Sequence, residues 1–370
     1  MQKICLVHWG LGRAGGGQRV TVELANALDE IGYTVSVISL DYCISTYYVL
    51  NDDINLYAIK EKFRIRDVIK PTIFKKIYNI VKKGGFNVIL TIGTGSALPM
   101  IPALLIKGVK IIVSEHTSYA NVCEQGERNK LARYLTARMA DKIVYLTKEN
   151  MILGNKLYNI PLVKQCVIPN FVYDVLRTSS QQAMYNPKSK KIITVGIYDK
   201  IKGYDILVKV AKEVLKKYKK WEWHIYGKKV DEKLVKCLEE CRKEWDCDNQ
   251  LFFHSDTQSI FEIYKTAGIY VMTSYNEGFP MALLEAKMFN LPIVSFDCHT
   301  GPRELIENGV SGYLVECYNR LEMENKISRL IENEELRKDF SCNARNNLKQ
   351  FNKKNILNKW KKVIDDVCAL

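Results

Sequence analysis

The stretch IYVMTSYNEGFPMALLEAKMFNLPIVSFD occupies residues 269–297. Residues 269–273 are apolar and partly β-branched, which predicts a short buried strand. The polar residues that follow predict a loop, and Pro280 fits the first turn of a helix, where its missing N–H costs nothing. Helical spacing predicts a helix over 281–289, and a Leu-Pro pair ends it before a second buried strand. The stretch therefore reads as one repeating unit of an α/β protein.

Two glutamates in this unit mark a candidate ligand site. The loop with Glu277 would lie at the carboxyl end of a parallel strand, facing the start of a helix, where free N–H groups and the helix dipole favour a phosphate. Glu285 lies in an otherwise apolar part of the helix, so its carboxylate should have a partner. The alternative is a pair of glutamates on a solvated helix face. A ligand with a central diphosphate and hydroxyl-rich groups on both sides would use the whole arrangement, and nucleotide sugars have that shape.

The same alternation of strand and helix patterns continues along most of the chain, which predicts parallel sheets covered on both faces. In the first part we expect strands at 4–8, 34–40, 87–92, 110–114, 142–146 and 163–168, and helices at 18–30, 69–82, 97–105 and 129–139. In the second part we expect strands at 192–196, 222–226, 251–254, 269–273, 292–296 and 312–315. The fold class is therefore α/β, with two doubly wound domains at 1–172 and 190–345 and a polar linker at 173–189.

The segment NEGFPMALLEA, with its two glutamates eight positions apart, resembles the retaining glycosyltransferases of family 4, which have the GT-B fold. Further segments resemble that family in the same order along the chain: KICLVHWGLGRAGGGQRV, SEHTSY (114–119), ADKIVYLTKEN (140–150), VIPNFV (167–172), TVGIYDKIKGYDILVKVA and TGPRELIENGVSGYLV (300–315). The resemblance implies two facing Rossmann-like domains with a cleft between them. It also implies a last helix, at about 350–370, that completes the first domain.

The resemblance implies roles for individual residues. Glu277 would contact the donor sugar, Lys202 the phosphates, and His116 would lie by the reacting sugar; these are the expected catalytic residues. Glu285 would contact the nucleotide ribose. The other expected donor-binding residues are Gly16, Gly17, Gly196, Gly278, Phe279, Met281, Ala282 and Arg303.

The implied activity is retaining transfer of a sugar from a nucleotide sugar, with a UDP-sugar favoured, to a glycan or lipid-linked acceptor in bacterial cell-surface polysaccharide synthesis. No cofactor and no metal are expected. One departure is Ile197, where the family usually has an arginine that contacts the diphosphate. We hypothesise that Arg303 or Arg13 supplies the missing positive charge.

Other functions remain open at this point. Gly10, Gly12 and Gly15 fit the G-x-G-x-x-G fingerprint of dinucleotide-binding proteins, and Asp41 could bind a ribose, so an NAD-dependent dehydrogenase is one alternative. That function would leave the two glutamates unused. Ile197 suggests a second alternative, a degenerate transferase that only binds nucleotide sugars. A nucleotide-sugar epimerase of the same architecture is a third.

Two groups of residues suggest a metal site, and we expect neither to be one. The acidic signature 246–248 (Asp-Cys-Asp) is more simply a charged turn. Cys237, Cys241 and Cys247 lack a fourth ligand nearby, which a structural zinc site would need. We therefore expect a chelator to leave activity intact. The 11 cysteines are scattered, as in a protein with reduced thiols.

The chain has a formal net charge of +14, and nine basic residues lie in the segment 60–83. A basic amphipathic surface there would favour an anionic membrane, and a solvated helix is the alternative. No nucleic-acid-binding motif accompanies the charge. The sequence shows no signal peptide and no membrane-spanning stretch. We therefore expect a cytoplasmic protein, with a peripheral position at the inner face of the membrane left open.

Overall fold

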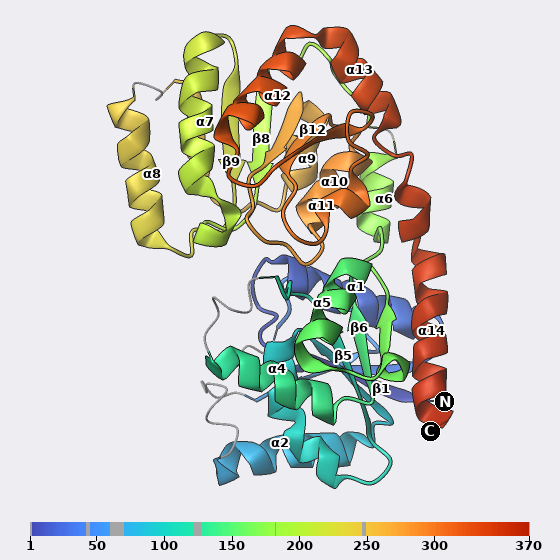
Figure 1. Ribbon diagram of the computed structural model, residues 1–370. Coiled ribbons are helices and arrows are strands. Elements are labelled where there is room, and N and C mark those ends of the chain that lie inside the picture. The colour runs from blue at the N-terminus through green and yellow to red at the C-terminus, as the bar shows by residue number, and fades with distance from the viewer. Residues whose placement is uncertain are drawn as a thin grey trace. The chain divides into compact units, whose positions relative to one another are not determined.

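The computed structural model describes residues 2–41, 45–59, 70–120, 127–181, 183–245 and 249–369, with the backbone alone for 127–129. The chain divides into two compact units (Figure 1). Unit 1 comprises Met1–Asn170 and Lys353–Leu370, and unit 2 comprises Phe171–Asn352. Each unit has a parallel sheet with helices on both faces, which confirms the predicted fold class.

The sheet of unit 1 has seven strands in the order β3-β2-β1-β4-β5-β6-β7. The strands are β1 (Lys3–His8), β2 (Thr34–Ser39), β3 (Asn55–Ala58), β4 (Val88–Ile92), β5 (Lys110–Glu115), β6 (Lys142–Tyr145) and β7 (Gln165–Val167). Strand β3 was not predicted. It is short, none of its residues is fully buried, and it is recognisable only by its pairing with β2 at the sheet edge.

The helices of unit 1 are α1 (Gly16–Glu30), α2 (Pro71–Gly84), α3 (Thr94–Ala97), η2 (Leu98–Leu105), α4 (Glu127–Met139), α5 (Lys148–Tyr158), η4 (Leu162–Lys164) and α14 (Lys353–Ala369). The expected α-helix at 97–105 is mostly the 3₁₀ segment η2. Pro99 and Pro102 explain the difference, because they lack the N–H groups that α-helical hydrogen bonds need. The last helix, α14, buries Ile356, Trp360 and Ile364 in unit 1.

The sheet of unit 2 has six strands in the order β10-β9-β8-β11-β12-β13. They are β8 (Lys191–Val195), β9 (Glu222–Tyr226), β10 (Leu251–His254), β11 (Ile269–Met272), β12 (Ile293–Phe296) and β13 (Gly312–Val315), and all six were predicted within one or two residues. The helices are α6 (Asp174–Ser180), η5 (Lys200–Lys202), α7 (Tyr204–Lys217), α8 (Glu232–Glu244), α9 (Ile260–Thr266), α10 (Met281–Met288), α11 (Pro302–Leu305), α12 (Arg320–Glu332), α13 (Glu334–Asn343) and η6 (Leu348–Phe351).

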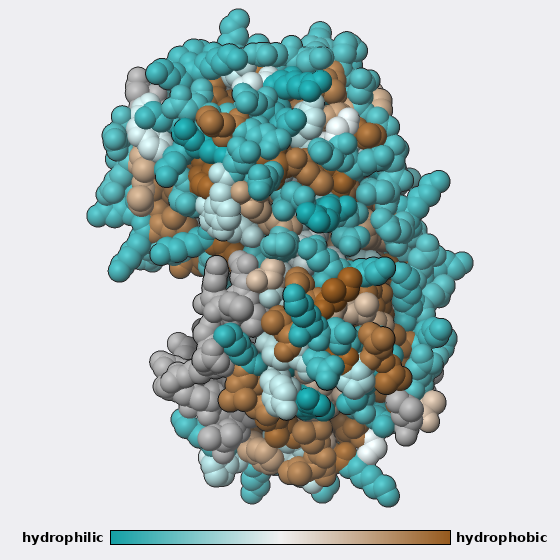
Figure 2. All heavy atoms as spheres, in the orientation of Figure 1, coloured by the Kyte–Doolittle hydropathy of each residue, from teal (hydrophilic) through white to brown (hydrophobic). Residues whose placement is uncertain are grey.

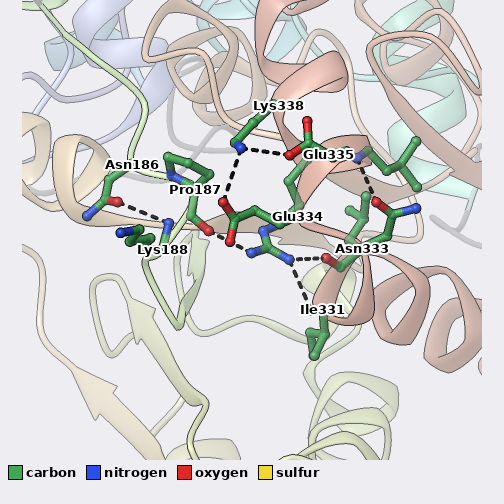
Figure 3. Close-up of polar contacts among 11 residues, drawn as sticks. Asn186, Pro187, Lys188, Ile331, Asn333, Glu334, Glu335 and Lys338 are labelled. Carbon is green, nitrogen blue, oxygen red and sulfur yellow. Dashed lines mark hydrogen bonds and ion pairs between the residues drawn. The ribbon is translucent and has the colours of Figure 1, made fainter.

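The segment 173–189, predicted as a linker, belongs to unit 2. Its first part forms α6, which packs against α9 and α10. Farther along, the carbonyl oxygen of Pro187 accepts a hydrogen bond of 2.6 Å from the buried Arg337, at the first turn of α13 (Figure 3). The polar composition misled the prediction, because these backbone groups are satisfied by contacts with distant parts of the chain.

The basic segment predicted to favour a membrane is described only from residue 70 onward, since 60–69 lie outside the described residues. In α2 the apolar stripe of Ile73, Ile77 and Val81 is buried in the core of unit 1. The described part of the segment therefore presents lysines, and not an apolar face, to the surroundings. Within the described ranges, no helix combines the length and the apolar character needed to cross a bilayer.

Candidate active site

The strand order of unit 2 places a candidate site outside the carboxyl ends of β8 and β11. These neighbouring strands form the switch point of the sheet, because the chain proceeds outward from β8 through β9 to β10 on one side, and from β11 through β12 to β13 on the other. Ligands of doubly wound folds bind at such a point. Lys202 follows β8 and Glu277 follows β11, so the topology brings together residues that lie 75 positions apart.

Lys202 and Glu277 form an ion pair, with 2.7 Å between Nζ and Oε1. The lysine side chain is 23% exposed and the glutamate side chain 12% exposed. Because the two charged groups are largely shielded from water, they attract each other more strongly than a pair on the surface. Their geometry is therefore fixed before a ligand binds. The sequence predicted both residues as site residues but did not predict that they contact each other.

The turn that carries Lys202 is anchored to β11. The hydroxyl of Thr273 donates a hydrogen bond of 2.9 Å to the carbonyl oxygen of Lys202. Gly203 follows with φ of +66°, and a Cβ there would lie 2.1 Å from the carbonyl oxygen of Thr273. Only glycine fits this position, since it has no Cβ and adopts the left-handed region without strain. The turn thereby holds the ammonium group of Lys202 at the switch point.

The loop that carries Glu277 is supported by the loop after β12. Asn276 forms a parallel bridge with His299, and the buried hydroxyl of Thr300 donates a hydrogen bond to the carbonyl oxygen of Glu277. Gly301 has φ of +103°, and a Cβ there would lie 2.5 Å from Cδ of Pro280. The two loops therefore form one rigid rim, which connects the EGFP and TGPRE segments that the sequence presented separately.

The predicted phosphate position is the start of α10. Pro280 occupies the cap position, and its carbonyl oxygen accepts hydrogen bonds of 3.1 Å from the N–H groups of Leu283 and Leu284. The first N–H groups of a helix have no acceptor within the helix, and the positive end of its dipole favours an anion. The positions predicted to contact the donor there, Gly278, Phe279, Met281 and Ala282, all lie at this start. Their contact with a diphosphate stays a prediction.

Glu285 is buried, with 7% exposure, and its carboxylate has partners as predicted. Oε1 accepts a hydrogen bond of 2.6 Å from the hydroxyl of Tyr173, and Oε2 accepts one of 3.1 Å from Tyr264. Burial, and then the charge of Glu285, raise the pKa of Tyr264 well above its usual value, so this phenol keeps its proton. The sequence did not identify either tyrosine, since each lies far from Glu285 along the chain. The predicted ribose contact remains untested.

Two further predicted residues lie at the same edge of the sheet. The carbonyl oxygen of Gly196, one residue after β8, accepts a hydrogen bond of 2.7 Å from Tyr204. Arg303 forms two hydrogen bonds with Asp297, of 3.0 Å from Nε and 2.7 Å from Nη2. The charge of Arg303 is thus partly offset before any ligand binds, and the side chain is half exposed. Ile197 is 37% exposed at the place where the family carries an arginine.

If Arg303 replaces the missing family arginine, Arg303→Ala should weaken nucleoside diphosphate binding by up to about fivefold, which is the range expected for one partly exposed charge. Isothermal titration calorimetry with UDP measures this change. Arg320→Ala is the control, because Arg320 is also an exposed arginine that pairs with a carboxylate. Equal affinity in the Arg303 variant and the native protein would reject the Arg303 hypothesis.

Unit 1 has its own switch point, between β1 and β4, and the predicted glycines lie beside it. Gly16 and Gly17 are the first residues of α1. A Cβ on Gly17 would lie 3.0 Å from Nε2 of His8, the last residue of β1, so a larger residue would displace the ring. His8 was not predicted as a site residue. The sequence feature that could have identified His8 as a site residue is its position at the end of the first strand, just before a glycine-rich turn.

The imidazoles of His8 and His116 are both neutral at pH 7. Removal from water lowers the pKa of His8 to about 4, although a hydrogen bond with Gly10 acts in the opposite direction. Desolvation, and then the charge of His8, lower the pKa of His116 to about 3. Nε2 of His116 lies 3.0 Å from Oγ of Ser114. A neutral imidazole can donate or accept a hydrogen bond to a hydroxyl, so these rings suit a polar ligand better than an anionic one.

The loop that carries His116 is fixed by a network within unit 1. The buried carboxylate of Glu115 accepts hydrogen bonds from the hydroxyls of Thr94 and Thr117. Asn150 donates to the carbonyl oxygen of Thr117 and accepts from the N–H of Tyr119, at 3.0 and 2.7 Å. His116 therefore has a defined place at the carboxyl edge of the unit 1 sheet. Arg13, the alternative source of positive charge, lies in the same unit near His8.

The expectation that neither candidate group binds a metal stays a prediction, because each group includes residues outside the described ranges. Across the described ranges, no group of three or more His, Cys, Asp or Glu side chains is arranged to hold a metal ion. Residues 246–248 lie outside those ranges, and so does the third cysteine of the group that includes Cys237 and Cys241.

Comparisons with known proteins agree with this arrangement. The model "Glycosyltransferase Family 4" matches residues 14–174, and the model "Glycosyl transferases group 1" matches residues 177–347. An uncharacterized glycosyltransferase of Haemophilus influenzae is 29% identical over 98% of this chain and 100% of its own length. The amylovoran biosynthesis glycosyltransferase AmsD of Erwinia amylovora is 26% identical over 99% of this chain and 100% of its own length.

Solved structures of low sequence identity share the fold. Sucrose-phosphate synthase from Thermosynechococcus elongatus matches with a TM-score of 0.85 and 16% identity, covering 100% of both chains. HepE of Anabaena, solved with UDP and glucose, matches with a TM-score of 0.79 and 15% identity, covering 99% of this chain and 100% of that chain.

Together, the two sheets and the family matches define a glycosyltransferase of the GT-B class. Within that class the chain is of the family 4 type, because the family 4 model covers most of unit 1 and the group 1 model covers most of unit 2. The protein is therefore a transferase enzyme, and the dehydrogenase alternative is wrong. The glycine pattern of the first turn reflects the Rossmann-like architecture that both kinds of enzyme share.

Proposed function

We propose that the enzyme transfers a sugar, with retention at the anomeric carbon, from a UDP-sugar to a glycan or lipid-linked acceptor in bacterial surface polysaccharide synthesis. The ion pair of Lys202 and Glu277 at the switch point of unit 2 is the observation that carries this proposal. It provides a fixed cation for the phosphates of a donor and a fixed carboxylate for the hydroxyl groups of its sugar.

Several relatives support the donor and acceptor classes. A Campylobacter jejuni relative, 24% identical over 99% of this chain, is named as an alpha-1,4-N-acetyl-D-galactosaminyltransferase for an undecaprenol-diphosphate-linked glycan. A Staphylococcus aureus relative that matches over 43% of this chain is named as a poly(ribitol-phosphate) alpha-N-acetylglucosaminyltransferase. The pneumococcal transferase GtfA, which shares the fold, was solved with UDP and GlcNAc. These names favour a UDP-sugar and an alpha-linked product.

In the proposed reaction, the bond between the anomeric carbon and the β-phosphate oxygen breaks, and the acceptor oxygen bonds to that carbon on the same face. The acceptor proton passes to an oxygen of the departing diphosphate. Lys202 and the start of α10 stabilise the charge that develops on this leaving group, which is electrostatic catalysis. Because these groups supply the positive charge, the proposed mechanism requires no divalent ion.

Glu277 and His116 have complementary proposed roles. Glu277 accepts hydrogen bonds from hydroxyl groups of the donor sugar and fixes its ring. The neutral imidazole of His116 hydrogen-bonds another sugar hydroxyl, for which its pKa of about 3 is suitable, since a charged imidazolium would repel the positive charge that develops on the sugar. Glu285 contacts the ribose. For this, the hydroxyl of Tyr173 or of Tyr264 gives up its hydrogen bond with the carboxylate.

A thermal-shift comparison of UDP, GDP and ADP tests the donor class. UDP at about 100 times its Kd should stabilise the protein by about 2.7 kcal/mol, a rise of several degrees in Tm. GDP and ADP should raise the Tm less than UDP does. The rise with UDP should persist in the presence of EDTA. Uridine, which lacks the diphosphate, is the control and should give almost no shift. A larger shift with GDP, or a UDP shift that EDTA abolishes, would reject the corresponding part of the proposal.

Transfer itself is tested by release of UDP from radiolabelled UDP-sugars with and without a membrane lipid extract. The proposal expects release, and a labelled glycolipid, only when both donor and extract are present. Nucleotide binding without release under any acceptor condition would support a binding scaffold instead. Interconversion of the donor sugar without acceptor would support an epimerase.

A further inference from the structure

Helix α4 of unit 1 carries a buried charge on Arg133. This residue shares one side of the helix with Thr136 and Ala137, at the spacing i, i+3, i+4, and all three are buried. The opposite side exposes Leu131 and Leu135, and hydrophobic residues are visible at the surface of this part of unit 1 in Figure 2. With Arg133 at 5% exposure and Leu131 at 58%, the helix reverses the usual order of charged residues outside and leucines inside. A permanent charge thereby lies in the interior, where it needs partners.

The partners of Arg133 lie in the loop that carries His116. Nη2 donates a hydrogen bond of 2.8 Å to Oγ1 of Thr117, and Nη1 lies 3.5 Å from the carbonyl oxygen of Ser118. The guanidinium carbon also lies 4.3 Å from the ring centre of Tyr119, which is a typical distance for a cation–π contact. Arg133 therefore contacts each of the three residues that follow His116 and connects them to α4.

The hydroxyl of Thr117 joins Arg133 to the buried carboxylate of Glu115. A hydroxyl has one proton, and a guanidinium can only donate. Because Arg133 donates to Oγ1 of Thr117, the hydroxyl proton points to its other neighbour, Oε1 of Glu115, at 2.6 Å. The N–H of Thr117 donates to the same carboxylate oxygen, at 3.0 Å. The residue before His116 is thus bonded twice to the residue after it.

These bonds fix the backbone on both sides of His116. Glu115 ends β5, and its two bonds with Thr117 close a short turn that has His116 at its tip. Without Arg133, the hydroxyl of Thr117 is no longer directed at Glu115, and the turn loses this connection with α4. Because a misplacement of about 1 Å can lower the rate of an enzyme about 100-fold, the connection matters for any catalytic use of His116.

We propose that Arg133 is a positioning residue, which acts through Thr117 and Glu115 to hold the imidazole of His116 in place for sugar transfer. The inference rests on the proposed role of His116, and it assigns to Arg133 no contact with donor or acceptor. A purely structural role is the competing explanation. An apolar residue of similar volume often serves stability as well as a buried charge does, so the fold alone gives little reason for an arginine here.

Steady-state kinetics of Arg133→Met in the full-length enzyme separate the two explanations. We expect kcat for transfer to fall about 10- to 100-fold while the Kd for UDP changes by less than about twofold, because the proposed diphosphate site lies in unit 2. In a His116→Ala background the same substitution should cause no further loss, since Arg133 acts through His116. An equal loss in that background, or a loss of UDP affinity together with kcat, would favour the structural role and overturn the proposal.

Arg138→Met is the matched control for this substitution. Arg138 is exposed on the same helix, and its guanidinium also lies near a tyrosine ring, 5.0 Å from the ring centre of Tyr134. The control should keep the kcat of the native enzyme. A loss in Arg138→Met equal to that in Arg133→Met would mean that the effect belongs to α4 as a whole and would reject the assignment to Arg133.

Chemical labelling tests the position of His116 without donor or acceptor. Diethyl pyrocarbonate acylates accessible neutral imidazoles, and peptide mass spectrometry measures the rate at each histidine. His116 should react about tenfold faster in Arg133→Met than in the native protein, which is the change expected when one hydrogen bond with a charged donor is lost. The exposed His299 of unit 2 is the internal reference and should react at the same rate in both proteins.

Thr117→Val is a second variant, and it carries little risk of unfolding because Thr117 is exposed. It removes the hydroxyl that joins Arg133 to Glu115, so it should lower kcat and raise the labelling rate of His116 as Arg133→Met does. Unchanged labelling of His116 in both variants would overturn the proposal. If the native protein transfers no sugar under any condition, the proposed transferase function fails, whereas the labelling still decides whether Arg133 holds His116.

Discussion

Replacing Glu277 with glutamine is expected to lower kcat/KM for sugar transfer by about 10²- to 10³-fold, with little change in the fold. Glutamine keeps the shape of the side chain, but it loses the negative charge that holds Lys202 at 2.7 Å and that would accept hydrogen bonds from the donor sugar. Because these interactions are needed most as the glycosidic bond breaks, kcat should fall more than nucleotide affinity. Steady-state transfer assays and UDP titrations measure the two effects separately.

Glu335→Gln provides a matched control for this change. Glu335 also accepts a hydrogen bond from a lysine, at 2.8 Å from Nζ of Lys338, but its side chain is 78% exposed. Surface pairs of this kind contribute little to stability, so the control should keep its activity and its Tm. Full activity in Glu277→Gln would show that the carboxylate is not required, and the proposed site would be wrong.

Replacing Lys202 with methionine is expected to have the second large effect. The variant keeps most of the apolar length of the side chain and removes the cation proposed to bind the diphosphate. We expect UDP affinity to fall about tenfold and kcat/KM by about 10²- to 10³-fold, since the same charge stabilises the ground state and, more strongly, the leaving group. The variant also leaves the carboxylate of Glu277 without this partner, so a lower Tm is expected.

Two comparisons separate a catalytic from a merely structural role of Lys202. Lys338→Met removes the exposed lysine of the control pair and should change neither activity nor UDP affinity. The double variant Lys202→Met/Glu277→Gln should recover part of the lost Tm, because no unpaired charge remains, but it should recover none of the lost activity. Activity that returns together with Tm would mean that the pair only stabilises the fold.

The sequence was informative where a property depends on neighbouring residues. The strands of unit 2 were predicted closely because each is a short apolar run between turn residues, as in the stretch that begins at Ile269. Pro280 marked the start of α10 to within one residue. Glu285 was expected to have partners because its helical neighbours are apolar, and the two tyrosine hydroxyls confirm this.

The sequence was misleading where local composition and tertiary packing disagree. The polar segment after Tyr173 looked like a linker, yet it forms α6 and is held by Arg337. Residues 98–105 have helical spacing, but their prolines give the 3₁₀ segment η2. For the basic segment 60–83 the sequence left a membrane surface and a solvated helix open, and in its described part the core of unit 1 covers the apolar stripe of α2.

By itself the sequence determined the architecture and the kinds of side chain in the site, since strand and helix patterns and the spacing of Glu277 and Glu285 are properties of adjacent residues. Only the tertiary structure decided which groups meet: Lys202 with Glu277, Glu285 with Tyr173 and Tyr264, and Arg303 with Asp297. Strand order brings Lys202 and Glu277 to one edge of the sheet of unit 2, whereas the packing of α6, α9 and α10 brings the two tyrosines to Glu285. The geometry of these contacts arises only when the unit folds, because no short-range pattern fixes the distance between residues on different loops and helices.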